Sequence, residues 1–253
     1  DAGVDAPGPG LALLDPARGL SARLRAEQAR SARLWLALWL APQLLTPIAL
    51  WRFGGDVAGR LGVTLAIALA PLTLSVGWLH GRYPSIGTLV AQGRTLEFDA
   101  LARRATAEAV AVFVAGALAL TGIVLLLPSV LPQLAVRVLP LPSLLALFGG
   151  ALASLLLQAM AGWLRAFRDE RIATPIVTGA AVTVVASGVG AALGGVGALT
   201  IAFAAASLGV AVPVAVVHFV RVRRERMHQV VCCGARRGPM VLIAMLQDPI
   251  VLC

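Results

Sequence analysis

Very few side chains in the apolar stretches of this sequence could take part in chemistry. These stretches contain no lysine or aspartate; their acid is Glu108 and their one deep amide is Gln158. Ionisable groups in such surroundings usually mark function, but there is no H-E-x-x-H metal motif and no aspartate cluster. Ser187 is flanked by small residues, as a nucleophilic serine in a tight turn would be. The only nearby histidine, His218, is however expected at the opposite membrane face, too far away to act as its base. We therefore predict no catalytic residue, no metal site and no cofactor, and a protein that is not an enzyme.

The composition determines the class of protein that carries these side chains. The chain has 253 residues, of which 59% are hydrophobic and 13% are charged, and its mean hydropathy is +0.88. Soluble domains carry about 25% charged residues, so a water-soluble globule is excluded. The three cysteines all lie within the last 22 residues, so no disulfide framework can organise the fold.

Apolar runs long enough to cross a bilayer give the architecture. A crossing needs roughly 17–25 residues at about 1.5 Å per residue, and the sequence predicts an all-α, six-helix transmembrane bundle. The expected spans are 34–51, 61–79, 105–127, 143–164, 172–193 and 196–220. Outside them we expect a flexible, basic N-terminal segment at 1–33 and, after a lobe at 34–226, a cytoplasmic or interfacial tail at 227–253. The first residues are acidic, do not resemble a signal peptide and lack an initiator methionine, so we expect this end to be a cut within a longer chain or a trimmed one.

The arginines orient these spans. Eighteen of the 21 fall on the side of both termini, and three (Arg52, Arg60 and Arg137) fall on the other side. An excess of arginine marks the cytoplasmic face, so both termini are predicted to be cytoplasmic. Because topology and anionic headgroups account for the net charge of +9, nucleic acid is not expected as a partner.

The fifth and sixth spans are predicted to form a hairpin. Only Gly194 and Gly195 separate them, which leaves room for a tight antiparallel turn. The fifth span also has a small or hydroxyl residue at every fourth position, from Gly179 through Thr183 and Ser187 to Ala191. Such a stripe favours close helix packing over a polar track for substrate. Pro71 could likewise mark a packing bend or the lining of a cavity.

A long inside connection links the second and third spans. Thr95 is a candidate N-cap with Glu97 and Asp99 in the first turn after it, which predicts a helix from about 96 into the third span. Before it, residues 84–93 have the pattern of a short amphipathic segment at the membrane surface, although a solvated connector would also fit.

Three stretches together resemble a known family. The first is LAIALAPLTLSVGWLHGRYPSIGTLVAQGRTLEFDALARR (65–104), in which a span with a proline is followed by a short surface segment and a small turn. The second is RVLPLPSLLALFGGALASLLLQAMAGWLRAFRDERIATPIV (137–177), in which a span ends in an "LRA" turn and a proline opens the next helix. The third is GVGAALGGVGALTIAFAAASLGVAVPVAVVHFVRVRRER (188–226), which has the pattern of a hairpin with a basic end. The chain is similar to the polysaccharide biosynthesis and O-antigen flippase branch of the multidrug/oligosaccharidyl-lipid/polysaccharide (MOP) exporter superfamily.

The resemblance implies one lobe of a transporter. Family members have twelve or more helices in two six-helix lobes around a central cavity, so six spans would be one lobe, most simply the C-terminal one. A single lobe cannot enclose the cavity, which implies that the chain is part of a flippase or pairs with a second six-helix lobe. The implied activity is translocation of a lipid-linked oligosaccharide, an undecaprenyl-diphosphate-type glycolipid, to the outer leaflet during cell-envelope polysaccharide biosynthesis.

An anionic diphosphate needs cationic partners, and the chain offers several substrate-binding candidates. They are Arg52 and Arg60 on the outer side, Arg82 and Arg165 on the inner side, and Gln158 within the fourth span. For each arginine the alternative is a topological or headgroup anchor, and for Gln158 it is a hydrogen bond between helices. Two further functions stay open: a six-helix permease subunit whose 84–104 connection docks a separate ATPase, and a membrane assembly protein without transport activity.

Overall fold

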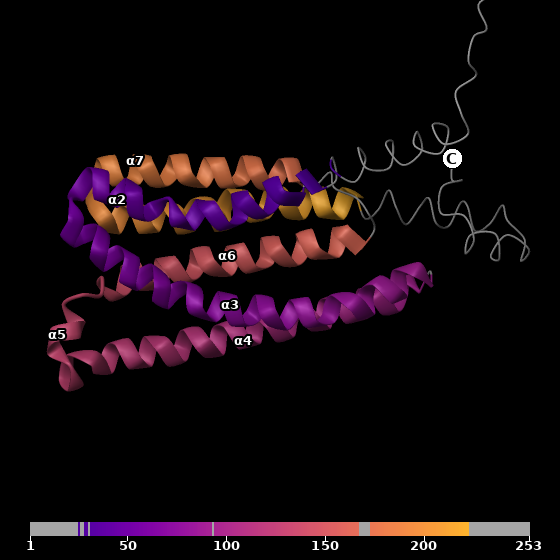
Figure 1. Ribbon diagram of the computed structural model, residues 1–253, viewed down its shortest axis with the longest axis horizontal. Coiled ribbons are helices and arrows are strands. Elements are labelled where there is room, and N and C mark those ends of the chain that lie inside the picture. Colours follow the sequence, from indigo (N-terminus) through magenta and orange to yellow (C-terminus); the bar gives the residue numbers. More distant parts are fainter. Residues whose placement is uncertain (1–24, 26–27, 30, 93, 167–172, 223–253) are drawn as a thin grey trace, which may run out of the picture.

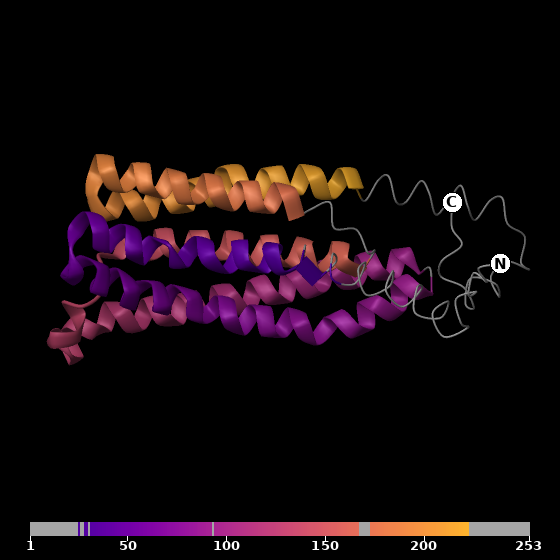
Figure 2. The ribbon, with the colours of Figure 1, turned by 45° about the horizontal axis from the view of Figure 1, so that its top comes forward.

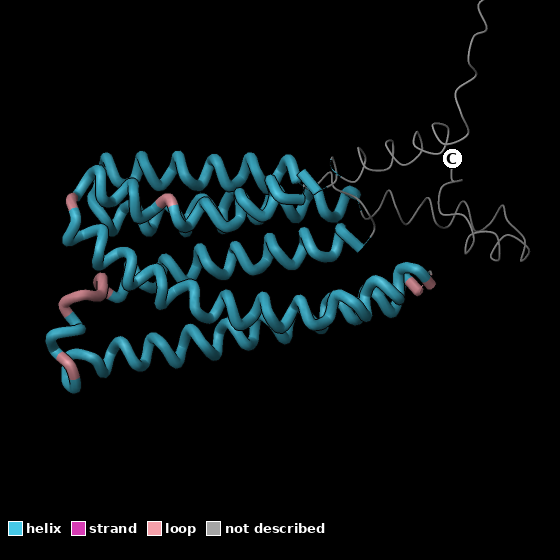
Figure 3. The backbone as a smooth tube through the Cα atoms, viewed as in Figure 1, coloured by secondary structure: helices cyan, strands magenta, loops and turns pink. Residues whose placement is uncertain are grey.

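The part of the chain that the structure describes consists of helices and short connecting segments. The computed structural model describes residues 25, 28, 29, 31–92, 94–166 and 173–222, and contains no strand among them. The elements are a helical segment at 31–43, α2 (Leu45–Phe53), α3 (Gly55–Ala91), α4 (Thr95–Val130), the single turn α5 (Pro132–Ala135), α6 (Leu141–Ala166), α7 (Ala173–Ala206), the π-helical turn η1 (Ser207–Ala211) and a last helix at 212–222. The pink connecting segments in Figure 3 lie mainly at the two ends of the bundle. The expected all-α fold is confirmed.

The described helices are long and apolar enough for a polytopic membrane protein. Five elements meet that description: Ser31–Phe53, Gly55–Val90, Leu96–Val130, Leu141–Arg165 and Ala173–Val222. The last of them has 50 residues, which at about 1.5 Å per residue is more than twice the hydrocarbon thickness of about 30 Å. It is folded in two at Gly194 and Gly195, so the described part of the chain has six membrane-length limbs.

The fold in α7 is the predicted glycine turn. Gly194 (φ −143°, ψ 16°) and Gly195 (φ 80°, ψ −166°) leave the helical conformation, and the positive φ of Gly195 favours glycine because it has no Cβ. The two limbs then pack closely, since a Cβ on Gly190 would lie 2.7 Å from the Ala198 carbonyl oxygen and one on Gly179 would lie 3.0 Å from Ala211 Cβ. These pairings run in opposite directions along the chain, so the expected tight antiparallel hairpin is confirmed.

The bundle has two unlike ends, which Figure 1 shows at the right and at the left. We call the right-hand end, where the chain ends of the described region lie, the terminal end. Leu34 and Val222 belong to one packed cluster there, with Leu164 and Ile176. The opposite, distal end holds the turn between α2 and α3, the α5 turn and the Gly194–Gly195 turn (Figures 1 and 2).

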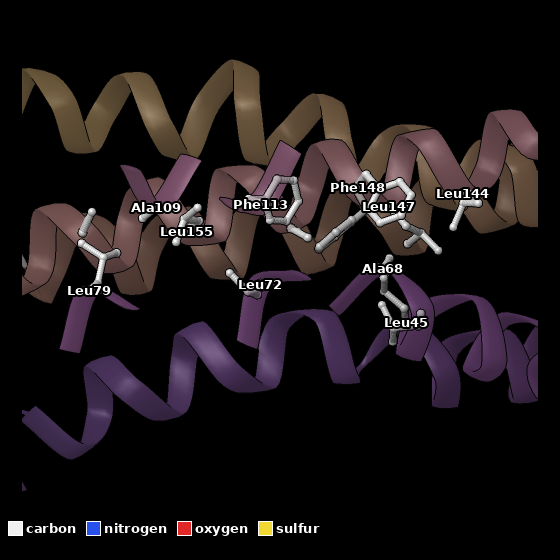
Figure 4. Packing of buried hydrophobic residues seen from close by; sticks show 14 of the residues in the cluster. Leu45, Ala68, Leu72, Leu79, Ala109, Phe113, Leu144, Leu147, Phe148 and Leu155 are labelled. Carbon is white, nitrogen blue, oxygen red and sulfur yellow. The ribbon is translucent and has the colours of Figure 1, made fainter. Parts of the chain in front are cut away.

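Helix α6 lies at the centre of the packing. Its residues Leu147, Phe148 and Leu155 join the large apolar cluster formed with α2, α3 and α4, several members of which are seen in Figure 4. Its residues Leu157 and Leu164 join the second cluster, formed with the 31–43 segment and the α7 hairpin. Among the 18 most apolar consecutive residues of each helix, 56% are buried in α6 but only 6% in α4. Helix α4 is therefore the least covered helix of the bundle.

The described part of the connection between α3 and α4 is mostly helical, which corrects the expectation of a separate surface segment at 84–93. Helix α3 passes through Pro84 and ends at Ala91. A proline inside a helix removes one backbone hydrogen bond, but the continued helix buries Ile86 in the same cluster as Phe98 of α4. This packing outweighs the local loss, and α3 and α4 extend beyond α6 at the terminal end as one helical hairpin (Figure 1).

Helix α4 begins close to the predicted position. It starts at Thr95 and is capped by Arg94 without a side-chain hydrogen bond, so the expected N-cap at Thr95 is wrong by one residue. The first turn is held instead by an ion pair, in which Arg94 Nε lies 2.8 Å from Glu97 Oε1. The helix then runs unbroken to Val130, which confirms the prediction of one continuous helix from the connection into the third span.

Small residues and Pro71 serve packing. Gly179, Thr183, Ser187 and Ala191 are buried, and the Thr183 and Ser187 hydroxyls donate to carbonyls one turn back along their own helix at 2.9 and 2.7 Å. Pro71 is buried opposite Gly116 of α4, where an added Cβ would lie 3.1 Å from the proline Cβ. Both features therefore fit the packing interpretation.

Two predicted segments fall mainly or wholly outside the described residues. These are the N-terminal segment at 1–33, of which the structure describes only a few positions, and the tail at 227–253, which contains all three cysteines.

Candidate functional site

A cavity at the distal end is the first candidate site. It has a volume of about 290 Å³ and lies between the first turns of α3, the last turns of α4, and the α5–α6 connection. We call it the distal pocket. It is lined by Arg60, Val124, Leu125, Leu127, Pro128, Ala135, Val138, Leu139, Pro140 and Leu141. Arg60 is therefore the one polar side chain among otherwise apolar walls.

A buried threonine fixes the back of the distal pocket. Thr64 is fully buried, and its hydroxyl donates to the Arg60 carbonyl oxygen at 2.7 Å and accepts the Leu139 N–H at 2.9 Å. The Leu139 N–H lies ahead of α6, outside any helical ladder, and would otherwise be unsatisfied in apolar surroundings. Thr64 therefore ties the α5–α6 connection to α3 and sets the shape of the pocket.

Arg60 is only partly engaged by the protein. Its Nη2 donates to the Val138 carbonyl oxygen at the long distance of 3.4 Å, while its Nε is buried and has no hydrogen-bond partner in the described part of the chain. A buried donor without a partner costs about 1–3 kcal/mol. The pocket thus holds a guanidinium with hydrogen-bonding capacity left for an acceptor.

The second candidate site lies at the terminal end, where Glu108 gathers three donors from α3 and α4. Arg82 Nη2 and Trp78 Nε1 reach Glu108 Oε2 at 3.1 and 3.2 Å, and Arg104 Nε reaches Oε1 at 2.9 Å. Arg82 also lies over the Trp78 ring, 5.6 Å from its centroid. We call these four residues the Glu108 cluster; with two arginines and one carboxylate it keeps one net positive charge.

At the same end of the bundle, a row of aromatic rings, which we call the aromatic chain, connects the 31–43 segment to α6. Trp35, His80, Tyr83 and Trp163 follow one another with ring centroids 5.8, 5.2 and 5.6 Å apart. Arg165 lies over the Trp35 ring at 5.0 Å. The Trp163 Nε1 donates to Thr106 Oγ1 at 3.1 Å, which joins α6 to α4. Aromatic rings with polar tips are typical of the membrane–water interface.

The structure separates the five residues proposed to bind substrate. Arg60 lines the distal pocket, Arg82 belongs to the Glu108 cluster and Arg165 stacks on Trp35. Arg52 is exposed in the last turn of α2. Gln158 is half-buried in the middle of α6. The arginines thus lie at opposite ends of the bundle, with Arg52 and Arg60 at the distal end and Arg82 and Arg165 at the terminal end.

Sequence reasoning did not single out the two hydroxyls that join separate segments. Thr64 and Thr106 each accept a hydrogen bond from another element, but other threonines such as Thr121 bond only to their own helix. The sequence gives only a weak signal for Thr64, namely its place one turn after Arg60 near the end of a span. Within the described residues, no group of three or more His, Cys, Asp or Glu could hold a metal ion.

Comparison of the chain with protein-family models, with curated proteins and with solved structures found no match.

Proposed function

We propose that this chain is one lobe of a translocase that moves a lipid-linked oligosaccharide across the membrane. The observation that supports this most is the place of the three family-like stretches in the bundle. In order, they form the α3–α4 hairpin, α6 with the start of α7, and the α7 hairpin with its last helix. These elements account for most of a six-limb bundle whose described ends lie on one side (Figure 1).

In this proposal the terminal end faces the cytoplasm of a bacterial cell, in its inner membrane. The glycolipid carries an anionic diphosphate, which charge-assisted hydrogen bonds would bind more strongly than neutral ones. The Glu108 cluster holds Arg82 and Arg104 at the interface with one net positive charge, and Arg165 lies at the end of α6. These arginines are proposed to receive the diphosphate, while the polyprenyl chain stays in lipid.

The proposal also requires a second six-helix lobe. The described interior is filled by apolar side chains of α3, α4 and α6, and the distal pocket of about 290 Å³ is at the small end of ligand sites, which run from about 300 to 1,000 Å³. A hydrated sugar chain would therefore pass along a face of this lobe, between it and its partner. Helix α4 offers the least covered apolar face, with Leu118 and Leu126 at 68% and 63% exposure.

Depletion of the protein in cells tests the function directly. We expect surface polysaccharide to fall and lipid-linked repeat units to accumulate in the cytoplasmic leaflet, and expression of the unchanged protein should reverse both effects. The double substitution Arg82→Gln and Arg165→Gln should fail to reverse them, whereas the exposed Arg52→Gln should succeed. Depletion without any build-up of lipid-linked repeat units would refute the proposal.

A second function is favoured by one observation. Helices α3 and α4, with 37 and 36 residues, are about 55 Å long, against a hydrocarbon core of about 30 Å. Their common tip extends beyond α6 and would serve a permease subunit as the docking element for a separate ATPase. Purification of the endogenous protein in mild detergent distinguishes the two functions, because an ATPase that co-purifies and detaches when residues 92–94 are replaced supports the permease.

A further inference from the structure

We propose that the distal pocket binds the phosphate headgroup of an anionic lipid, with Arg60 as the cationic partner and the lipid chain lying along α4. This inference concerns binding alone. It stands whether the lipid is a cargo or a resident of the membrane, and it does not require the chain to be a translocase.

The hydrogen-bonding capacity of Arg60 indicates the class of headgroup. A guanidinium has five N–H donors in a fixed fork, and the protein uses one of them, at 3.4 Å to the Val138 carbonyl oxygen. The buried Nε has no partner in the described region, and no described carboxylate forms an ion pair with Arg60, although Asp56 lies one turn earlier on α3. A phosphate monoester presents several oxygens, which can accept from two N–H groups of this fork at once.

The walls and size of the distal pocket favour a lipid over a soluble phosphate. All lining residues other than Arg60 are apolar. Contact of these walls with hydrocarbon is more favourable than contact with the water that surrounds a soluble ion. The volume of about 290 Å³ suits a small headgroup and the first carbons of its chains. A complete oligosaccharide would not fit.

The position along α4 places the pocket at the depth of lipid headgroups. Four lining residues, Val124, Leu125, Leu127 and Pro128, lie in the last turns of this helix, after an apolar length sufficient to cross the hydrocarbon core. Leu125 and Leu126 are 59% and 63% exposed beside the pocket. A chain attached to a headgroup at Arg60 can therefore run along the uncovered face of α4 toward the middle of the membrane.

Lipid titration observed by native mass spectrometry tests the proposal. The complete protein, purified in detergent, is titrated with dioleoyl phosphatidic acid and, separately, with dioleoyl phosphatidylcholine. We expect Arg60→Gln to weaken phosphatidic acid binding about tenfold and to leave phosphatidylcholine binding unchanged. Arg52→Gln is the matched control, because Arg52 lies at the same end of the bundle but is exposed outside the pocket. Equal losses in the two variants would overturn the proposal.

Three further arms separate the pocket from indirect effects. Ala135→Trp fills the pocket without changing charge and should also weaken phosphatidic acid, which decides the matter if Arg60→Gln does not fold. Thr64→Val removes the hydroxyl contact to Leu139 and keeps Arg60; if it alone reproduced the tenfold loss, the shape of the connection and not the cation would be responsible. Displacement of the lipid by inorganic phosphate at equal concentration would show a free anion site and overturn the lipid assignment.

Discussion

Arg60 and Arg82 lie on the same helix, 22 positions apart, and the protein treats them differently. At the terminal end, Arg82 donates to the Glu108 carboxylate at 3.1 Å and stacks on Trp78. At the distal end, Arg60 reaches only a backbone carbonyl, at 3.4 Å, and keeps a buried Nε without a partner among the described residues. A guanidinium paired with a carboxylate has much of its charge balanced by the protein. The Arg60 guanidinium retains hydrogen-bonding capacity for a ligand. Neither the residue type nor the position in the span reveals this difference between the two arginines.

The two ends also differ in what holds them together. The terminal end is joined by side chains that contact one another, in the Glu108 cluster and in the aromatic chain from Trp35 to Trp163. The distal end is joined by Thr64, whose hydroxyl satisfies the backbone N–H of Leu139. The terminal end should therefore respond to changes of ring or charge, and the distal end to the loss of one hydroxyl.

We expect the largest loss of stability from Gly162→Val at the terminal end. A Cβ on Gly162 would clash with the Tyr83 hydroxyl oxygen, and the Tyr83 ring is held between His80 and Trp163. Overpacking of this kind costs about 1–3 kcal/mol, and here the upper value applies because the ring has neighbours on both sides. Thermal unfolding in detergent should show a lower midpoint. Gly77→Val is the control, because nothing lies within 4 Å of its added Cβ; equal midpoints would contradict the packing.

Thr64→Val should give the next largest effect, at the distal end. Valine keeps the shape of threonine but leaves the buried Leu139 N–H without an acceptor, which costs about 2 kcal/mol. Thr183→Val is the matched control: Thr183 is also buried, but its hydroxyl donates only to the Gly179 carbonyl oxygen of its own helix. The same unfolding assay compares them. A control that is as unstable as Thr64→Val would mean that Thr64 does not tie the α5–α6 connection to α3.

A similar substitution at the other end, Thr106→Val, should cost less, about 1 kcal/mol. The donor that loses its acceptor is Trp163 Nε1. The Trp163 ring is buried, but Thr106 is only half-buried, so water can reach the freed N–H more easily than a backbone N–H beside the fully buried Thr64. Thr121→Val is the control on the same helix, since its hydroxyl reaches only the Ala117 carbonyl oxygen. If Thr106→Val were more destabilising than Thr64→Val, the comparison between the ends would be reversed.

Much of the fold, but less of the site, could be predicted from the sequence. The order of the membrane-length helices and the Gly194–Gly195 turn were readable because a membrane crossing and a positive φ depend on local sequence. The helical extension through Pro84 was not, because it depends on Ile86 packing in one cluster with Phe98 of another helix. The difference between Arg82 and Arg60 could not be predicted for the same reason, because it depends on partners distant in the sequence. Glu108 is 26 positions from Arg82, and Val138 is 78 positions from Arg60.

Glu108→Gln should have the smallest effect and the most direct bearing on the comparison. The substitution removes the carboxylate that Arg82 and Arg104 share and so makes Arg82 resemble Arg60, a cation without an acidic partner. Native mass spectrometry should then show about threefold tighter binding of phosphatidic acid, because an unpaired cation near the surface attracts anionic lipid. The gain should persist in Arg60→Gln, since the new affinity arises at the terminal end, and should vanish in Glu108→Gln combined with Arg82→Gln. Unchanged lipid affinity in Glu108→Gln would mean that pairing with a carboxylate is not what distinguishes the two arginines, and that the apolar walls of the distal pocket alone set Arg60 apart.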